Sequence, residues 1–132
     1  MKYSQATDYA LHVMLYLIME DSEKPVGVQM LAEKLKVSRS YLSKMMAQLV
    51  KAELIQSVSG LNGGYRLRKP GKDISFLEVI QAIEGTGSLY ECNLNHGSGC
   101  LIQQVVLEAE QQMEDYLKHK KIADLLKSAK TD

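Results

Sequence analysis

Apolar residues recur every three or four positions in the first part of the chain, which is the spacing of amphipathic helices. This spacing predicts a first helix over residues 4–19 and a short second helix over residues 28–35, separated by a polar break that contains Pro25. Asp8 and His12 lie off the apolar stripe of the first helix and are neighbours one turn apart. The stripe itself consists of Ala6, Tyr9, Ala10, Val13, Met14, Leu17 and Ile18.

A third helix follows the second after a very short turn. Lys36 and Val37 form the turn, and Ser38 is a good N-cap for a helix that ends near Lys51. The outer face of this helix is polar and basic, and its buried stripe is predicted to consist of Leu42, Met45, Met46 and Leu49. Two helices joined by so short a turn, the second with a basic outer face, predict a helix-turn-helix.

The period changes from helical to strand-like after the third helix. Residues 54–58 and 65–68 have the pattern of two short strands, and Asn62, Gly63 and Gly64 give a turn signal between them. A hairpin directly after a recognition-type helix is a wing. The predicted fold is therefore mainly α with a small β-hairpin (α+β): a winged helix-turn-helix domain followed by a long helix.

The remaining elements are helices connected by one long loop. Ser75 and Glu78 fit the capping-box pattern at the start of a fourth helix, which Gly85 ends. Residues 86–99 are polar and loop-like, and Cys92 and Cys100 bracket the second half of this loop. A long amphipathic helix over about residues 101–118 comes next, followed by a short helix over residues 122–126.

The apolar stripe of the long helix needs a surface to pack against. Since the winged domain already has its own core, a partner subunit is the simplest answer. We therefore predict a winged domain at residues 1–85, a cysteine-containing effector loop at 86–100, and a dimerisation helix at 101–132 whose short last helix packs back on the winged domain. The predicted dimer contacts are Ile102, Val105, Val106, Ala109, Met113 and Tyr116.

Charge is unevenly distributed although the net charge is zero. The chain has sixteen Lys and Arg and sixteen Asp and Glu. Residues 34–72 hold nine bases and one acid, a net charge of +8, whereas residues 76–132 hold five lysines and nine acids, a net charge of −4. A basic block beside acidic segments is the electrostatic pattern of nucleic-acid binding. A solvated charged surface is the alternative interpretation.

Composition excludes several other classes of protein. A chain of 132 residues with 45% hydrophobic and 24% charged residues is typical of one soluble domain with an extra arm. The longest apolar stretch, residues 9–19, is shorter than the roughly 20 residues of a membrane span. No basic and apolar leader resembles a signal peptide, and two cysteines cannot form a disulfide framework. We expect a cytoplasmic protein.

Four short segments, taken in order, resemble one bacterial family. They are TDYAL at residues 7–11, LAEKL at 31–35, SYLSK at 40–44 and GGYRL at 63–67. Together they resemble the Rrf2 family of winged-helix transcription regulators, whose members include the iron–sulfur cluster regulator IscR, the nitric-oxide-sensing repressor NsrR and the cysteine-metabolism repressor CymR. The resemblance covers nearly the whole chain. It implies a homodimer that binds double-stranded DNA at a pseudo-palindromic operator, with the two long helices crossing. We expect a repressor, and activation is the alternative.

The residues expected to contact DNA come from the start of the third helix and from the wing. Backbone N–H groups and the helix dipole at the helix start favour a phosphate. The Ser and Tyr hydroxyls would fix the register on the backbone, and Arg39, Ser43 and Lys44 would reach base edges. Arg66 would pair with a phosphate or enter the minor groove. The expected set is Ser38, Arg39, Ser40, Tyr41, Ser43, Lys44, Asn62, Gly63, Gly64 and Arg66.

Ordinary structural roles are alternatives for several of these residues. Tyr41 could serve packing alone, and Gly63 and Gly64 could serve only the turn. Arg68 and Lys69 are equally well explained as solvated bases.

The wing departs from the family pattern at one position. Many family members carry a basic residue just before the wing glycine, whereas this chain has Ser59 before Gly60. A basic side chain there can probe the minor groove, but serine offers little beyond one hydrogen bond. We expect a sequence preference that is weaker than that of those relatives or distributed differently.

The cysteine loop resembles the cluster-binding loop of some family members, but incompletely. Cys92 and Cys100 match the first two of three cysteines, and the third would fall near Val106 in an apolar stripe. An iron–sulfur cluster needs about four protein ligands. In some relatives a carboxylate or histidine from the first helix of the partner completes the set, so the resemblance makes Asp8 and His12 candidate ligands beside the two cysteines.

Other interpretations of the loop remain open. Zinc could bind Cys92, His96 and Cys100, although their spacing matches no standard short zinc motif. Alternatively, the two thiols could oxidise reversibly to a disulfide, or they could be inert remnants. No cofactor is therefore certain from the sequence.

Two other functional classes are alternatives to a DNA-binding regulator. A winged helix can serve protein–protein contact without specific DNA binding. An enzyme is disfavoured because the chain shows no Gly-rich phosphate loop, nucleophile elbow or convincing pair of carboxylates, and a Cys92–His96 pair would lie in a Gly-containing loop.

Overall fold

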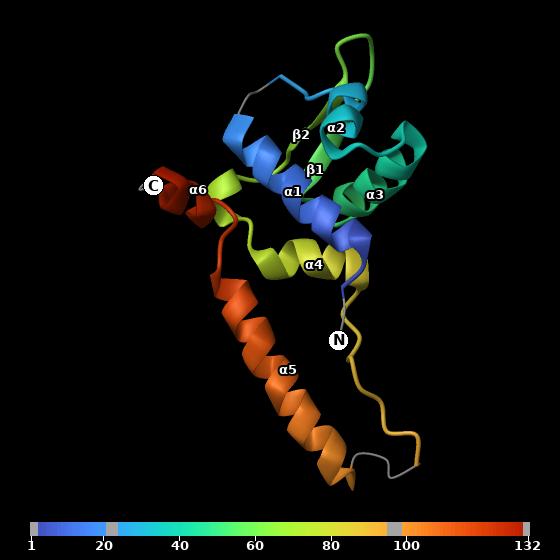
Figure 1. Ribbon diagram of the computed structural model, residues 1–132, viewed down its shortest axis with the longest axis vertical. Coiled ribbons are helices and arrows are strands. Elements are labelled where there is room, and N and C mark those ends of the chain that lie inside the picture. The colour runs from blue at the N-terminus through green and yellow to red at the C-terminus, as the bar shows by residue number, and fades with distance from the viewer. Residues whose placement is uncertain (1–2, 21–23, 95–98, 131–132) are drawn as a thin grey trace.

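The computed structural model describes residues 3–20, 24–94 and 99–130. Three helices come first, followed by a two-stranded antiparallel hairpin and a fourth helix, and a long and a short helix end the chain (Figure 1). A 3₁₀ turn, η1 (Gly71–Asp73), joins the hairpin to the fourth helix. The helices and strands are α1 (Gln5–Glu20), α2 (Val28–Leu35), α3 (Arg39–Lys51), β1 (Ile55–Val58), β2 (Gly64–Leu67), α4 (Phe76–Glu84), α5 (Leu101–His119) and α6 (Asp124–Lys130).

Local signals in the sequence set most helix boundaries. Ser75 and Glu78 form the predicted capping box: the Ser75 side chain accepts from the Glu78 backbone N–H at 3.1 Å, and the Glu78 carboxylate accepts from the Ser75 N–H at 3.1 Å. Gly85 ends α4 at a φ of 85°, a conformation that favours glycine. The predicted buried stripe of α3 is also confirmed, because its buried residues are Leu42, Met45, Met46 and Leu49.

The last helix differs from its prediction because tertiary pairing competes with helix formation. The segment before α6 forms an isolated bridge between Ser75 and Lys121, and the Ile122 N–H donates to the Ile74 carbonyl at 3.0 Å. This pairing holds residues 120 and 121 outside the helix, and a turn at residues 122 and 123 follows, so the helix begins at Asp124 rather than at residue 122. The same pairing buries Ile122, which is 1% exposed, in the core of the winged domain.

One core unites helices α1 to α4, the hairpin and the segment before α6. Its fully covered side chains are large and apolar, and each contributes about 1.5–3 kcal/mol of burial free energy. The largest of them are Met14, Leu31, Leu42, Met46, Leu49, Leu54, Ile55, Ile74 and Ile122. The core therefore includes residues from both ends of the chain.

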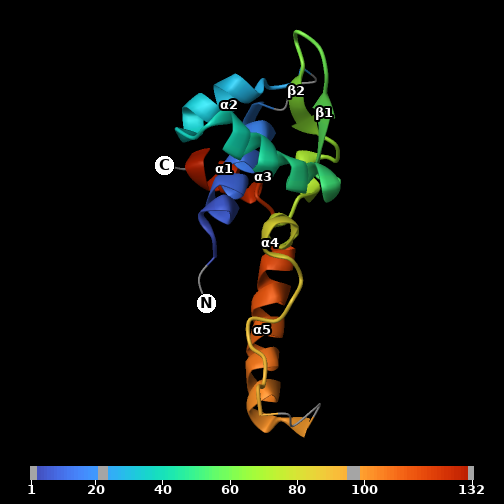
Figure 2. The ribbon, with the colours of Figure 1, turned by 90° about the vertical axis from the view of Figure 1, so that its right-hand side faces the viewer.

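The long helix α5 projects away from this core (Figures 1 and 2). None of its 19 residues, all of which the structure describes, is buried. Val106, Met113 and Leu117 are half-buried, and Met113 receives a weak hydrogen bond from the Tyr3 hydroxyl at 3.9 Å. Ile102, Val105 and Tyr116 remain 63–67% exposed. One side of the apolar stripe thus faces its own chain and the adjacent side faces solvent.

No helix in the described part of the chain combines the length and the apolar character that crossing a membrane requires.

A buried threonine connects the start of α1 to the end of α4. Thr7 is 1% exposed, and its hydroxyl donates to Glu84 Oε2 at 2.7 Å. The same oxygen accepts from the Ser4 backbone N–H at 2.8 Å and from the Ser4 hydroxyl at 3.1 Å. The Thr7 hydroxyl and then the Ser4 N–H lower the pKa of Glu84, and burial opposes them only in part.

We expect Glu84 to make the fold sensitive to acid. Because its folded pKa lies below its unfolded value, the carboxylate stabilises the fold at neutral pH, and this contribution is lost as the pH falls through the folded pKa. Melting temperatures measured between about pH 7 and about pH 3 should therefore fall less for Glu84→Gln than for the wild type. Glu91→Gln, on an exposed loop residue, should follow the wild type. A Glu84→Gln curve parallel to the wild-type curve would contradict this role.

Candidate nucleic-acid interface

The exposed face of α3 begins at a capped helix start. The Ser38 side chain accepts from the Tyr41 backbone N–H at 3.1 Å, as its position in the sequence predicts. Arg39, Ser40, Ser43 and Lys44 are all exposed, so none of these polar side chains is used in the core. The start of α3 therefore presents basic and hydroxyl groups to solvent beside the positive end of the helix dipole.

Tyr41 combines a packing role with an exposed edge. Its ring meets the Tyr9 ring edge-to-face, with 5.9 Å between centroids and an angle of 87° between planes. Tyr41 is nevertheless 39% exposed. Packing against α1 thus accounts for its orientation and leaves part of the side chain available for a ligand.

The turn between α2 and α3 is held by the backbone. Lys36 has a φ of 57°, in the left-handed region, and its N–H donates to Glu33. The Val37 N–H donates to the Ala32 carbonyl at 3.1 Å. These bonds complete the C-terminus of α2 and fix the point at which α3 begins, as a helix-turn-helix requires.

The wing requires both of its central glycines for steric reasons. A Cβ on Gly64, whose φ is 151°, would lie 2.1 Å from the Val26 carbonyl oxygen, because Val26 and Tyr65 form a backbone bridge. A Cβ on Gly63 would lie 2.1 Å from the Val58 carbonyl oxygen. Close packing within the protein thus explains both residues, and their contact with DNA stays a prediction.

Three basic side chains where the wing joins the rest of the domain have hydrogen-bond or ion-pair partners. Gln56 and Arg66 are opposite each other in the hairpin, and with its amide oxygen facing the guanidinium, Gln56 accepts from Arg66 Nε at 2.6 Å and Nη2 at 3.2 Å. Arg68 lies 4.0 Å from the Glu53 carboxylate, with both side chains largely exposed. Lys69 donates to Glu78 at 2.7 Å. Lys69 therefore contributes to the start of α4.

The charge of Glu78 reflects this partner. Partial burial raises its pKa, but the hydrogen bond from Lys69, the Ser75 backbone N–H and the charge of Lys69 together lower it below its usual value. Glu78 thus remains ionised at neutral pH. Its carboxylate holds Lys69 and caps α4 at the same time.

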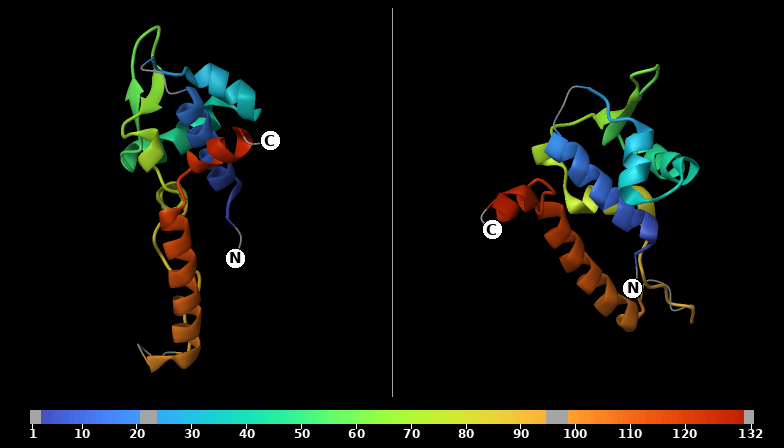
Figure 3. Two further views of the ribbon diagram at one scale, coloured as in Figure 1. Left: turned by 90° about the vertical axis from the view of Figure 1, so that its left-hand side faces the viewer. Right: turned by 45° about the horizontal axis from the view of Figure 1, so that its top comes forward.

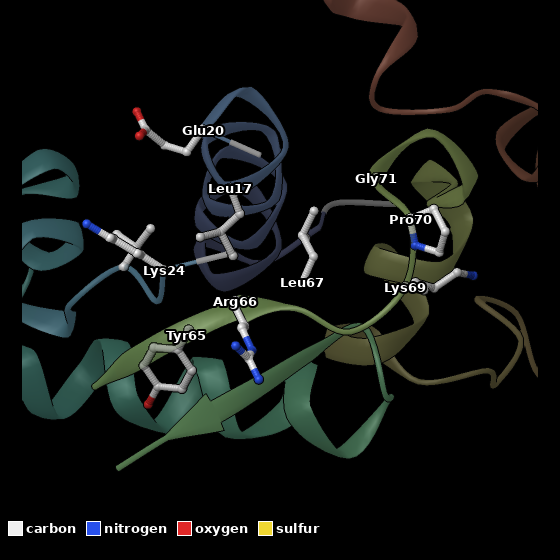
Figure 4. Close-up of a pocket in the computed structure, with 10 residues that line it drawn as sticks. Leu17, Glu20, Lys24, Tyr65, Arg66, Leu67, Lys69, Pro70 and Gly71 are labelled. Carbon is white, nitrogen blue, oxygen red and sulfur yellow. The ribbon is translucent and has the colours of Figure 1, made fainter. Parts of the chain in front are cut away.

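A cleft of about 370 Å³ lies between the end of α1 and the wing (Figure 4). Leu17 of α1 and Leu67 of β2 line it, and its charged lining residues are Glu20, Lys24, Arg66 and Lys69. Three bases and one acid line this cleft. Because Lys69 is paired with Glu78, the net charge that the cleft adds near the start of the wing is +1.

The two cysteines lie in different environments. Cys100 is 5% exposed, and its sulfur caps α5 by accepting from the Gln103 backbone N–H at 3.4 Å. Cys92 is half-buried in the preceding loop. His96, the nitrogen donor considered for zinc, lies outside the described residues.

Glu110 attaches the first part of this loop to α5. Its carboxylate accepts from the Ser88 hydroxyl at 2.9 and 3.1 Å and from the Leu89 backbone N–H at 2.5 Å. No local pattern predicts this pairing, because the serine and the glutamate are 22 positions apart and both residue types are common on surfaces. The first part of the loop and the long helix therefore form one arm.

Asp8 and His12 are adjacent on the surface of α1. His12 Nδ1 lies 2.8 Å from the Asp8 carbonyl oxygen and 3.3 Å from its carboxylate, and both side chains are more than 60% exposed. They border an apolar recess of about 160 Å³ that includes Phe76. Cys100, by contrast, begins α5 at the end of the molecule farthest from the winged domain (Figures 1 and 2).

The predicted cluster ligands do not gather within one subunit. Among the described residues, no group of three or more His, Cys, Asp and Glu side chains is arranged to hold a metal ion. The donor set of one chain therefore does not fit a cluster that needs about four ligands. A shared site would have to draw Asp8 or His12 from a second copy.

Comparisons with known proteins place this arrangement in a family context. A family model for Rrf2, described as an iron-dependent transcriptional regulator, matches residues 3–128. The HTH-type transcriptional regulator NsrR of Oceanobacillus iheyensis is 29% identical, over 97% of this chain and 91% of that protein.

Solved structures show the same architecture. IscR from T. potens superposes with a TM-score of 0.77 at 30% identity, covering 98% of this chain and 88% of that chain. The oxidized form of Staphylococcus aureus CymR superposes with a TM-score of 0.74 at 28% identity, covering 95% of each chain. These likenesses, with the observed hairpin, confirm the predicted winged-helix fold.

Proposed function

Because this chain belongs to the Rrf2 family of transcriptional regulators, we propose that it is a repressor that binds a pseudo-palindromic operator in double-stranded DNA as a homodimer. The observation that carries this proposal is the exposed basic start of α3 beside a sterically fixed wing. The relatives compared above are named regulators rather than enzymes, in agreement with the prediction that the chain is not an enzyme. A dimer that covers its operator would exclude polymerase from the same DNA.

The proposed contacts divide into three kinds. The Ser38, Ser40 and Tyr41 hydroxyls and the nearby N–H groups would hold phosphates at the start of α3. Arg39, Ser43 and Lys44 would reach base edges in the major groove. The wing would meet the adjacent minor groove and its backbone through Asn62, Gly63, Gly64 and Arg66.

The exposed side of α5 is the proposed dimer interface. Ile102, Val105, Ala109 and Tyr116 are exposed and follow the 3.5-residue spacing of helices that pack side by side. Val106 and Met113 flank this face on the side that is half-covered by their own chain. Such a stripe is stable in water only when another surface covers it, and an identical helix has the matching spacing.

Each of the three segments of the chain has its own role in this proposal. Residues 1–85 would bind DNA, residues 86–100 would receive a signal, and residues 101–132 would pair the subunits. The pairing of residues 120–122 with residues 74–76 anchors the end of α5 in the winged core. Movement of the arm would therefore move the DNA-binding surface.

We propose a thiol response for the effector loop. Cys100 caps α5, so its oxidation to a disulfide with Cys92 would take the sulfur away from the Gln103 N–H at the start of the dimerisation helix. A peroxide would supply the oxidising equivalents: two thiols and one hydrogen peroxide give one disulfide and two waters.

Arg39→Ala tests the DNA-binding proposal. Loss of a base contact should weaken binding by about 1–3 kcal/mol to a duplex that the wild type selects from a random pool, and wild-type affinity should fall steeply with salt. Lys127→Ala on α6 removes an exposed base outside the proposed interface and should bind as the wild type does. Unchanged affinity of Arg39→Ala would remove Arg39 from the interface. Salt-independent binding would favour the protein-interaction alternative.

Val105→Asp tests the dimer. A charge within the exposed α5 stripe should convert the dimer to a monomer in sedimentation equilibrium and lower operator affinity. Leu107→Asp places the same charge on a different face of α5 and should remain dimeric. A wild-type protein that sediments as a monomer at micromolar concentration would overturn the dimer proposal.

Analysis of protein purified without oxygen distinguishes a thiol response from a cluster. We expect no stoichiometric iron, acid-labile sulfide or zinc, and we expect peroxide to oxidise both thiols and change operator affinity. Cys92→Ser should bind DNA but lose the peroxide effect. Iron and sulfide in stoichiometric amounts, lost in Cys92→Ser or Asp8→Ala, would instead establish a cluster shared between subunits.

A further inference from the structure

Leu61 is the most exposed large apolar side chain in the described part of the chain, with a relative exposure of 105%. Single exposed leucines are common on protein surfaces, so exposure alone says little. Leu61, however, occupies a hairpin tip, where Gly, Asn, Asp and Ser are the usual residues. An apolar residue at this point makes no contact that stabilises its own chain.

The turn that carries Leu61 is fixed at both ends. The Gly63 N–H donates to the Gly60 carbonyl at 3.1 Å, so Leu61 and Asn62 are the two central residues of a tight turn. Gly60 has a φ of 106°, and Gly63 has no room for a side chain. The hairpin thus holds Leu61 in place without covering it.

The wing loop projects beyond the helices at the end of the molecule opposite α5 in each view (Figures 1, 2 and 3). A surface docked on α3 and the wing would therefore meet this tip. Residues 57–64 hold no charged side chain, although the surrounding block has a net charge of +8. Arg66, the nearest base along β2, is engaged by Gln56 further down the hairpin.

Electrostatic attraction would thus bring the wing to DNA, while the contact at its tip is apolar. The minor groove of A·T pairs suits such a contact, because its floor lacks the amino group that guanine places there. Leucine is also one of the side chains that proteins insert into minor grooves.

We propose that Leu61 is a specificity-determining residue that reads the minor groove beside each major-groove site by apolar contact, favouring A·T pairs. This inference rests on the proposed function. An apolar contact can be distinguished from a phosphate contact by salt. Because an apolar side chain releases no counterions, its replacement leaves the salt dependence of DNA affinity unchanged.

Two matched variants of Leu61 test the proposal. Because Leu61 does not pack in the fold, we expect both variants to fold as the wild type does. Leu61→Asn keeps a similar size but is polar, whereas Leu61→Met remains apolar. On the duplex that the wild type selects from a random pool, we expect Leu61→Asn to bind about tenfold more weakly and Leu61→Met to bind within about twofold of the wild type. All three should show the same slope of affinity against salt.

A modified base locates the contact. Diaminopurine in place of adenine adds an amino group to the minor-groove floor and keeps the major-groove edge of the A·T pair. At the base pairs that the wing protects from hydroxyl radicals, this replacement should weaken wild-type and Leu61→Met binding by about fivefold or more and leave Leu61→Asn nearly unchanged. Met19→Ala, an exposed apolar residue at the end of α1, should behave as the wild type does throughout.

The outcomes separate this proposal from the proposed function. If the wild type selects a duplex and Arg39→Ala weakens binding while Leu61→Asn does not, only the role of Leu61 is overturned. Equal sensitivity of wild type and Leu61→Asn to diaminopurine overturns it as well. If the wild type selects no duplex, the proposed function fails and the role of Leu61 fails with it.

Discussion

Burial of one stripe of α3 is the constraint on which the rest of the structure depends. Leu42, Met46 and Leu49 are completely covered by the core, so α3 cannot rotate about its axis without exposing them. The opposite face, with Arg39 and Lys44, is thereby directed outward. The Ser38 cap and the left-handed Lys36 fix the position of the helix start. The basic face is therefore rigid because of apolar packing behind it, and its charges need no partners within the protein to be held in place.

Helix α5, unlike α3, is not held by packing in the core. The core of the winged domain is complete without this helix, and only the side that faces α4 and the loop is half-covered. The bonds between residues 74–76 and 120–122 nevertheless fix its end to the core. Helix α5 is anchored at one end and apolar along its exposed side. It can transmit a movement to the winged domain only when another surface packs against that exposed side. A second copy would supply that support, and it would also set the distance between two recognition helices.

Local patterns in the sequence predicted most of the fold, because caps, turns and apolar spacing act over a few residues. The boundaries of α2 and α3 and the Ser75–Glu78 capping box required nothing more. Features that depend on distant pairing were missed. Thr7 is buried because Glu84, 77 positions away, accepts its hydrogen bond, and α6 begins late because Ile122 pairs with Ile74. For the site, the sequence predicted which bases are exposed on α3, but not that Gln56 engages Arg66 or that the Gly60–Gly63 turn leaves Leu61 uncovered.

The position of the cysteines has a consequence for how a signal could reach DNA. Cys100 is already used as the N-cap of α5, and where relatives are expected to carry a third cysteine this chain has Val106, half-buried along the loop side of the helix. Glu110 attaches the loop to the same helix. A change at either sulfur would therefore act first on the start of α5, at one end of the molecule, whereas the proposed DNA-binding face lies at the other end. A change at the cysteines can reach the proposed DNA-binding face only if α5 moves as a rigid helix, or if a partner subunit contacts both ends of the molecule. The proposed dimer interface, rather than the loop alone, is thus the element through which an effector would act.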